Sequence, residues 1–308
     1  MKRELVILFI LVLGFISCDE IDDPIPKDVG QDIEYNDVTY VVDPALNIGN
    51  LNGLLDLIDN NSWTEVNGGD NSTERFIVLE EFTGHQCIFC PNGTKELLRL
   101  DSIYGEQLIP VSIHAGSFAE PSTGKYETDY RVLPHCNIYQ SEFNVATFGY
   151  PAGLVSRRNA QLENKDNWGI VIADLADDVP QAELKLKNYY SQDLNVVRVN
   201  LGITFNQVPT ETFNLQLYIT EDHIRDWQKD FAQGDIENYD HRHMLRKVVN
   251  GTYGRSLENI TAGEEINIEY ILPLEANWKP DDVESVAFIF DSDPSSYNII
   301  QGNSAHVK

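Results

Sequence analysis

The apolar and polar positions of residues 76–114 follow two patterns, one typical of buried strands and one typical of a helix. Phe76–Phe82 and Leu108–His114 are mostly apolar and have the length of strands. Asn92–Tyr104, which lies between them, has a helix-like pattern. This stretch therefore predicts a strand, a helix and a second strand.

The following residues continue this order less regularly. A long irregular segment contains a predicted helix around Tyr130–Phe143. A turn with Pro151 then leads into a short strand, and Trp168–Leu184 is expected to be a helix that Pro180 would end early. The order of these elements predicts an α/β domain over residues 71–183.

From about Leu184 the pattern changes to strands at roughly regular spacing, separated by turn residues. Among them, only His223–Phe231 has a helix-like pattern. The series predicts an all-β domain over residues 184–308, an immunoglobulin-like β-sandwich. The expected strands are Val196–Phe205, Phe213–Ile219, Ile266–Ile271 and Val286–Phe290.

The start of the chain has the pattern of an exported protein. Lys2 and Arg3 precede an apolar stretch, Leu5–Ile16, that is too short for a membrane span and typical of a signal peptide. The stretch ends at Cys18 in a context that resembles a bacterial lipobox. We therefore expect residues 1–18 to be a lipoprotein signal peptide with lipid on Cys18; the alternative is an ordinary signal peptide with an incidental cysteine.

Residues 19–70 are expected to form a flexible tether and a lead-in with a strand at Val38–Val42. The acidic patch Asp19–Asp23 resembles the surface-export signal of some Gram-negative bacteria, whereas other bacteria use an aspartate there for inner-membrane retention. We expect an outer-membrane lipoprotein at the cell surface or the periplasmic face. Lipid on Cys18 would be its only membrane attachment.

The charge of the chain is strongly negative. The 308 residues include 49 acidic and 22 basic side chains, which gives a net charge of −27. Such a field repels phosphate backbones, so we expect no nucleic-acid partner. Disulfides persist outside the cytoplasm, so the cysteines of an exported protein are candidates for disulfide bonds.

A Cys-x-x-Cys motif lies between a predicted strand and a predicted helix, at Cys87 and Cys90. This is the thioredoxin redox arrangement. The first cysteine sits at the first helical turn, where free N–H groups and the helix dipole stabilise a thiolate. Cys87 is the candidate nucleophile and Cys90 the resolving thiol. Zinc is the main competitor, but the chain has no second Cys-x-x-Cys pair.

The segment VLEEFTGHQCIFC aligns without a gap to thioredoxin sequences. Glu81 then occupies the buried acidic position that assists proton transfer, and Pro151 occupies the cis-proline position facing the motif. Ile88 and Phe89 carry no charge to lower a thiol pKa, so the helix and His85 would have to do so. A structural disulfide in a binding domain remains an alternative.

Cys136 is the odd cysteine once Cys18 is assigned to lipid. It would be a buried inert thiol, a redox partner of Cys87, or part of a copper or zinc site. The ligands of such a site would come from Cys87, Cys90, Cys136 and one of His85, His114 and His135. No motif for an organic cofactor is present, and we expect none.

Tyr239–His243 places His241 and His243 two residues apart. On a strand they would share a face, which suits a metal. No cysteine or carboxylate cluster accompanies them at motif spacing, so the start of a polar strand is the favoured interpretation.

Three segments together resemble the outer-membrane protein 28-related lipoprotein family: FTGHQCIFCPNGT, TFGYPAGLVSR and NYDHRHMLRKVVNGTYG. The similarity covers roughly residues 70–300. It implies a thioredoxin-like domain followed by a β-sandwich on a lipid anchor, and it implies little about activity. Of the thioredoxin functional positions, Cys87, Cys90 and Pro151 match, and Glu81 fits less closely.

The leading hypothesis is thiol–disulfide exchange with an envelope or surface protein, with Cys87 attacking, Cys90 resolving and Pro151 holding the partner backbone. The second is a surface binding or adhesion lipoprotein in which the disulfide is structural. The third is copper or zinc handling through the cysteines and histidines. The sequence does not name a partner.

Overall fold

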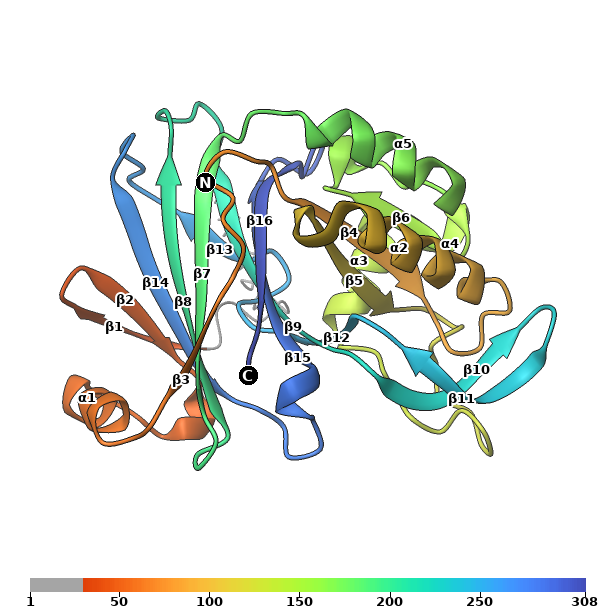
Figure 1. The fold of residues 1–308 in the computed structure, drawn as a ribbon, viewed down its shortest axis with the longest axis horizontal. Coiled ribbons are helices and arrows are strands. Elements are labelled where there is room, and N and C mark those ends of the chain that lie inside the picture. The colour runs from red at the N-terminus through yellow and green to blue at the C-terminus, as the bar shows by residue number, and fades with distance from the viewer. Residues whose placement is uncertain (1–29) are drawn as a thin grey trace, which may run out of the picture.

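Two large sheets organise residues 30–308, the part of the chain that the computed structural model describes (Figure 1). One has six strands and the other eight, and a two-stranded hairpin stands apart from both. The predicted signal peptide, residues 1–18, and its lipidation site at Cys18 lie outside the described residues.

The six-stranded sheet joins the start of the described chain to its second half. Its order is β1-β2-β14-β8-β7-β3. Its strands are β1 (Gln31–Tyr35), β2 (Val38–Val42), β14 (Glu265–Pro273), β8 (Val196–Phe205), β7 (Ala182–Ser191) and β3 (Thr64–Asn67). The predicted tether and lead-in thus contain β1 to β3, the helix α1 (Leu51–Asp59) and a short 3-10 turn, η1 (Pro44–Leu46).

The eight-stranded sheet has the order β16-β15-β9-β12-β5-β4-β6, with β13 paired to β9. Its strands are β16 (Ile299–His306), β15 (Val283–Asp291), β9 (Phe213–Glu221), β12 (Met244–Val248), β5 (Leu108–His114), β4 (Ile77–Thr83), β6 (Ala152–Val155) and β13 (Arg255–Leu257). The sheet crosses the expected boundary at residues 183 and 184, because β12 pairs with β5 through Met244 and Ser112. The division into two domains at that boundary stays a prediction.

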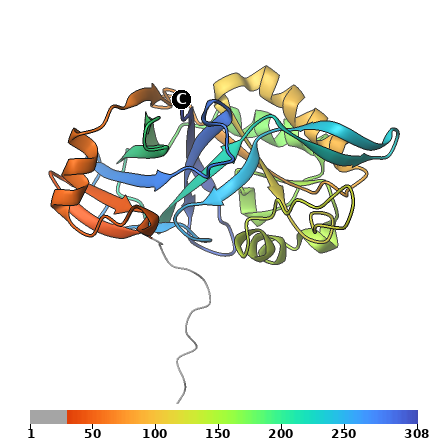
Figure 2. The same ribbon diagram turned by 90° about the horizontal axis from the view of Figure 1, so that it is seen from below.

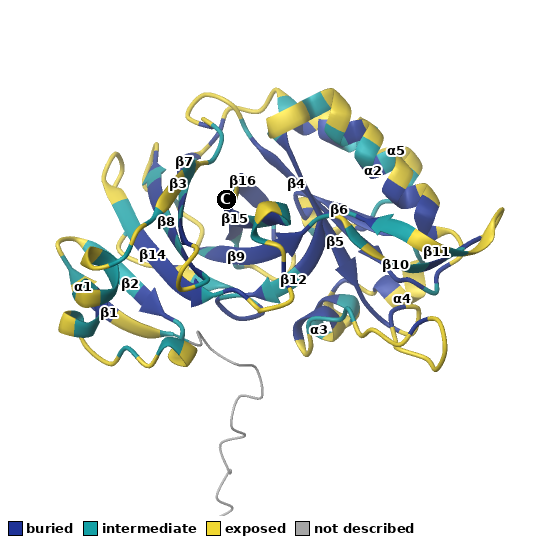
Figure 3. Cartoon of the chain, turned by 60° about the horizontal axis from the view of Figure 1, so that its bottom comes forward, coloured by how far each residue is buried: buried dark blue, intermediate teal, exposed yellow. Residues whose placement is uncertain are grey.

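Helices cover both faces of the β4–β5–β6 part of this sheet. On one face lie α2 (Cys90–Tyr104) and α5 (Lys165–Ala176), which pack on Ile77 and Leu79. On the other lies α3 (His135–Glu142), whose Tyr139 packs in the same core as Val78 and Phe82. Because β4 is covered on both sides, all seven of its residues are buried (Figure 3). The remaining helices are α4 (Val145–Phe148) and the 3-10 turns η2 (Gly105–Gln107), η3 (Arg158–Ala160) and η4 (Pro280–Asp282).

The second half of the molecule buries its core between the two sheets. Apolar side chains of β7, β8 and β14 meet those of β9 and β15, for example Leu201, Ile268, Leu217 and Ile289. Alternating burial along β7 and β8 gives this inner face. The described fold is therefore mixed α/β and built mostly from sheets. Within residues 30–308 no helix is long and apolar enough to cross a bilayer.

Three predicted helices differ from the structure. His223–Phe231 is wrong as a helix: Ile224–Asp230 is strand β10, which pairs with β11 (Gly234–His241). The helix expected from Tyr130 begins only at His135, because Pro134 disfavours helical backbone at the residue before it. The helix expected to reach Leu184 ends at Ala176, and Ala182 already begins β7.

Candidate functional site

Cys87 and Cys90 form a disulfide at the start of α2. Their Cα atoms are 5.4 Å apart, and α2 begins at Cys90 with Pro91 in its first turn. The two cysteines are only 2% and 1% exposed. The disulfide therefore lies at a helix N-terminus, as predicted, but beneath the protein surface.

Glu81, on β4, is fully buried in the same region. Ser112 Oγ donates a 3.3 Å hydrogen bond to its Oε2, while its Oε1 has no partner among the described residues. Burial raises the pKa of Glu81 to about 8, although the hydrogen bonds from Ser112 and Thr94 oppose the shift. At neutral pH the group holds a proton that it can release.

Pro151 and Glu81 meet at the first turn of α2, at Gly93. A Cβ atom on Gly93 would lie 2.5 Å from Glu81 Oε1 and 2.7 Å from Pro151 Cβ, so only glycine allows this approach. The Tyr150–Pro151 peptide bond is cis. The structure thus brings Glu81 and Pro151 together against the helix that carries Cys90. Gly93 was not predicted, and its only sequence feature is its place three residues after the motif.

The β10–β11 hairpin, which projects at one edge of the molecule in cyan in Figure 2, is hydrogen-bonded to the disulfide loop. The backbone N–H of Lys229 donates to the carbonyl of His85 at 2.8 Å, and that of Phe231 to the carbonyl of Ile88 at 2.9 Å. Gln228 Nε2 donates to the Cys87 carbonyl at 3.0 Å. At the tip of the hairpin, the rings of Phe231 and Phe89 stack with centroids 5.3 Å apart.

Three buried histidines lie beside this loop and are called the histidine cluster: His85, His114 and His241. The ring centroid of His114 lies 6.2 Å from that of His85 and 5.6 Å from that of His241. Burial lowers the pKa of all three, that of His241 to about 4. They are therefore neutral at pH 7. His241 ends β11, so the hairpin supplies one member of the cluster.

Cys136 and His135 lie in a different environment. Cys136 is a free, fully buried thiol on α3, and burial raises its pKa to about 11. His135 Nδ1 lies 2.7 Å from Thr252 Oγ1. Within residues 30–308, no three His, Cys, Asp or Glu side chains form a group suited to a metal ion.

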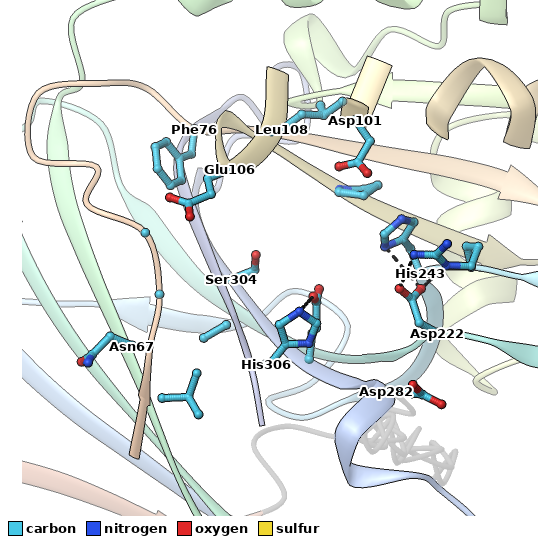
Figure 4. A pocket seen from close by; sticks show the side chains of 18 of the residues that line it. Asn67, Phe76, Asp101, Glu106, Leu108, Asp222, His243, Asp282, Ser304 and His306 are labelled. Carbon is cyan, nitrogen blue, oxygen red and sulfur yellow. Dashed lines mark hydrogen bonds and ion pairs between the residues drawn. The ribbon is translucent and has the colours of Figure 1, made fainter. Parts of the chain in front are cut away.

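His243 lies in a pocket of about 590 Å³ rather than beside His241 on a strand. The strand β11 ends at His241, and His243 adopts a φ of +50°. Figure 4 shows Asp101 and Glu106 on the α2 side of this pocket, and Asp222 on the side of His243. Because seven acidic side chains and one arginine are among the residues that line it, the pocket would favour cationic over anionic ligands.

These features define a class of protein: a mixed α/β, mostly β protein with a buried disulfide at a helix N-terminus. A family model described as outer membrane protein Omp28 matches residues 137–308, more than half of the chain, and the chain belongs to this family. The predicted family resemblance and the predicted outer-membrane location are confirmed. The matched residues begin after Cys90, so they do not include the disulfide.

Solved structures show a related fold at low sequence identity. HBP35 of Porphyromonas gingivalis is similar with a TM-score of 0.59 and 18% identity, over 76% of each chain. Protein AGR_C_4864 from Agrobacterium tumefaciens is similar with a TM-score of 0.50 and 11% identity, over 75% of this chain and 94% of that one. At such identities the likeness concerns the fold alone. No curated protein sequence matches the chain.

Proposed function

We propose that this outer-membrane protein exchanges disulfides with an envelope or surface partner through Cys87 and Cys90. The observation that carries the proposal is Glu81, a buried carboxyl group with a raised pKa and no cation beside it. A buried acid is costly for the fold, and a structural disulfide does not need one. A disulfide that opens and closes needs a proton donor for its leaving thiolate.

The exchange would proceed in two balanced steps. A thiolate of the partner attacks Cys87 Sγ, the bond between Cys87 and Cys90 breaks, and a mixed disulfide forms while Cys90 leaves as a thiolate. Glu81 supplies a proton to that thiolate. A second thiolate of the partner then attacks the partner's own sulfur in the mixed disulfide, and Cys87 leaves as a thiolate. The partner leaves oxidised, and a proton from solvent completes the Cys87–Cys90 dithiol. The reverse sequence reduces a partner disulfide.

The second candidate is a surface binding or adhesion lipoprotein in which the disulfide is structural. The burial of both cysteines under the hairpin favours it. The short loop argues against it. The cysteines are three positions apart, and a bond that closes so short a loop removes little chain entropy, about 2 kcal/mol in the unfolded state.

The finer fold and the anchor belong to the same proposal. The order β4, α2, β5, β6, α5 supports a thioredoxin-like domain over residues 71–183, with Pro151 at the start of β6. The two facing sheets support an immunoglobulin-like β-sandwich over residues 184–308. Lipid on Cys18 would hold the chain on the membrane.

The reduction potential of Cys87–Cys90 tests the proposal. The full chain in detergent is equilibrated in thiol buffers, and its free thiols are counted by alkylation and mass. A potential above about −250 mV is expected for an exchangeable pair. A potential below about −300 mV, with no mixed disulfide trapped by Cys90→Ser, would favour the structural disulfide. Cys87→Ser is the matched control, because it lacks the attacking thiol.

A further inference from the structure

Several buried polar atoms near the cluster of histidines have no hydrogen-bond partner among the described residues. They are Glu81 Oε1, His85 Nε2, His114 Nδ1, His114 Nε2, His241 Nε2 and Arg242 Nε. Buried polar groups almost always have hydrogen-bond partners, so these six atoms require an explanation. Packing alone does not give one, since apolar side chains would fill the same space at lower cost.

A cavity of about 10 Å³, which is room for about one water, lies beside His114, His241 and Arg242. Ser112 and Thr94 also line it. Ser112 Oγ donates to Glu81, and Thr94 also interacts with that carboxyl. Glu81 does not line the cavity itself, and these two hydroxyl groups connect it to the cavity.

Two half-buried tyrosines lie beside the two histidines, Tyr130 and Tyr239. The ring of Tyr130 lies 5.5 Å from that of His114 and 5.9 Å from that of His241. Tyr130 Oη donates to Asp226 Oδ2, and both residues are half-buried. Tyr239, also half-buried, lines the cavity and lies 4.9 Å from His241 between ring centroids.

We propose that His114 and His241 form, with water in this cavity, the route by which protons reach Glu81 from solvent. The inference rests on the proposed exchange and deepens it. Gln228, Tyr239 and His241 all come from the β10–β11 hairpin that covers the disulfide. One hairpin thus both contacts the disulfide loop and supplies residues of the route that returns a proton to Glu81.

The route acts after the bond has broken and before the mixed disulfide is resolved. It limits net reduction, because until Glu81 regains a proton the Cys90 thiolate can attack the mixed disulfide and re-form the original bond. Cys90 leaves with the electron pair of the broken bond and takes the Glu81 proton. The carboxylate that remains is buried without a cation, so it must be neutralised. Proton transfer from solvent through Tyr130 or Tyr239 and the neutral histidines restores the acid, and no atom or electron is left unbalanced.

The pH dependence of this route reflects every group that faces it. Glu81 is faced by Ser112 from β5, Thr94 from α2 and Tyr239 from β11. His114 is faced by His85, His241 and, at longer range, Arg246 of β12. Arg242 lines the cavity, and Asp226 and Asp240 act on His241. Among these groups Glu81, with a pKa of about 8, titrates within the pH range of the test.

The test uses dithiothreitol as the attacking dithiol and the full-length oxidised chain in detergent. The rate of Cys87–Cys90 reduction is measured from pH 5 to 9 by alkylation and mass, and corrected for the thiolate fraction of the reagent. His114→Gln and His241→Gln keep hydrogen bonding and similar volume but cannot relay protons near neutral pH. Both are expected to react at least about tenfold more slowly at pH 7, which is less than the roughly 10²–10⁴-fold that a positioned proton donor contributes, because each histidine acts through Glu81.

His135→Gln is the matched control, because His135 is also buried and neutral but bonds Thr252 away from the cavity. It should react like the wild type. Added imidazole should restore His241→Ala, since the deletion leaves space for it. Wild-type rates in both Gln variants, an equal loss in His135→Gln, or no restoration in a folded His241→Ala would overturn the route and leave the exchange intact. A native wild-type disulfide that resists reduction altogether would overturn both.

Discussion

Glu80 and Glu81 are neighbours on β4, and both are buried, yet only Glu80 has a cationic partner among the described residues. Glu80 accepts two hydrogen bonds of 2.7 Å from Arg157, and Tyr218 Oη lies 3.3 Å from it. Among the described residues, Glu81 accepts a 3.3 Å hydrogen bond from Ser112 and interacts with Thr94, and no cation acts on it. Successive residues of a strand point to opposite faces, so the two carboxyls belong to different cores.

The difference separates a carboxylate held for structure from one held for chemistry. Arg157 and Glu80 are hydrogen-bonded and charge-paired, and Tyr218 ties the pair to β9 in the other half of the eight-stranded sheet. Glu81 lies against Gly93 in the first turn of α2, the helix that begins at Cys90, and its Oε1 has no partner among the described residues. Sequence position alone does not distinguish them. Their partners do.

Removing the cation from the structural pair should have the largest effect. Arg157→Met leaves Glu80 buried without its counter-charge, and we expect a loss of about 3–5 kcal/mol in the free energy of unfolding. Urea denaturation at pH 7 measures it. The double variant Glu80→Gln with Arg157→Met should recover part of the loss. Equal stability of the single and double variants would show that the pair is not coupled.

Neutralising the second carboxyl, that of Glu81, should increase the stability of the protein at pH 7 rather than lower it. The pKa of Glu81 is raised in the folded protein from its ordinary 4.5 to about 8, so the folded state holds this proton more tightly than the unfolded state. Its stabilising contribution is therefore lost as the pH rises from about 4.5 to 8. Glu81→Gln removes this dependence, and its stability relative to wild type should rise by about 3 kcal/mol between pH 4 and pH 7.

Denaturation curves at several pH values, taken on both proteins, check this prediction. The difference between them isolates Glu81 from the other titrating groups. A difference that does not change with pH would mean that Glu81 is ionised in the folded state, and the contrast with Glu80 would disappear.

Removing the disulfide should cost less than removing Arg157. Cys87→Ala with Cys90→Ala opens a loop of only four residues, and we expect a loss of about 2 kcal/mol. Thermal unfolding under oxidising conditions measures it. A loss above that of Arg157→Met would make the bond a principal support of the fold, and the structural interpretation would then lead.

Weakening the contact between the β10–β11 hairpin and the disulfide loop should change the stability of the protein least. Phe231 is 70% exposed and contacts the disulfide loop through Phe89, so Phe231→Ser should lower stability by less than about 1 kcal/mol. The rate of disulfide reduction by dithiothreitol should rise severalfold, because the tip of the hairpin separates more easily. Val208→Ser, at an equally exposed apolar residue in another loop, is the control. An unchanged rate would mean that the hairpin does not limit access.

The hydrophobic pattern of the sequence correctly predicted helices and strands that are defined by their own residues. The strand Leu108–His114 has the expected bounds, and α2 and β4 lie within two residues of theirs. The hairpin was missed, because β10 lacks regular alternation and is a strand only through its pairing with β11. The histidine cluster was missed for a related reason: His85, His114 and His241 come from three distant segments that meet only in the folded chain.

The last strand carries a consequence for the order of events during biogenesis. Gln301 of β16 accepts from the backbone N–H of Phe76 and donates to the carbonyls of Asn71 and Glu74, and Arg75 donates to the carbonyl of Ile299. Residues that lead into β4 therefore find their partners more than 220 positions later. Contacts at such separation form slowly. The segment that holds the disulfide cannot finish folding until almost the whole chain has emerged. A chain shortened by ten residues would lose β16, which would leave β15 as an unpaired sheet edge and the residues before β4 without these partners, and both would be more open to proteolysis.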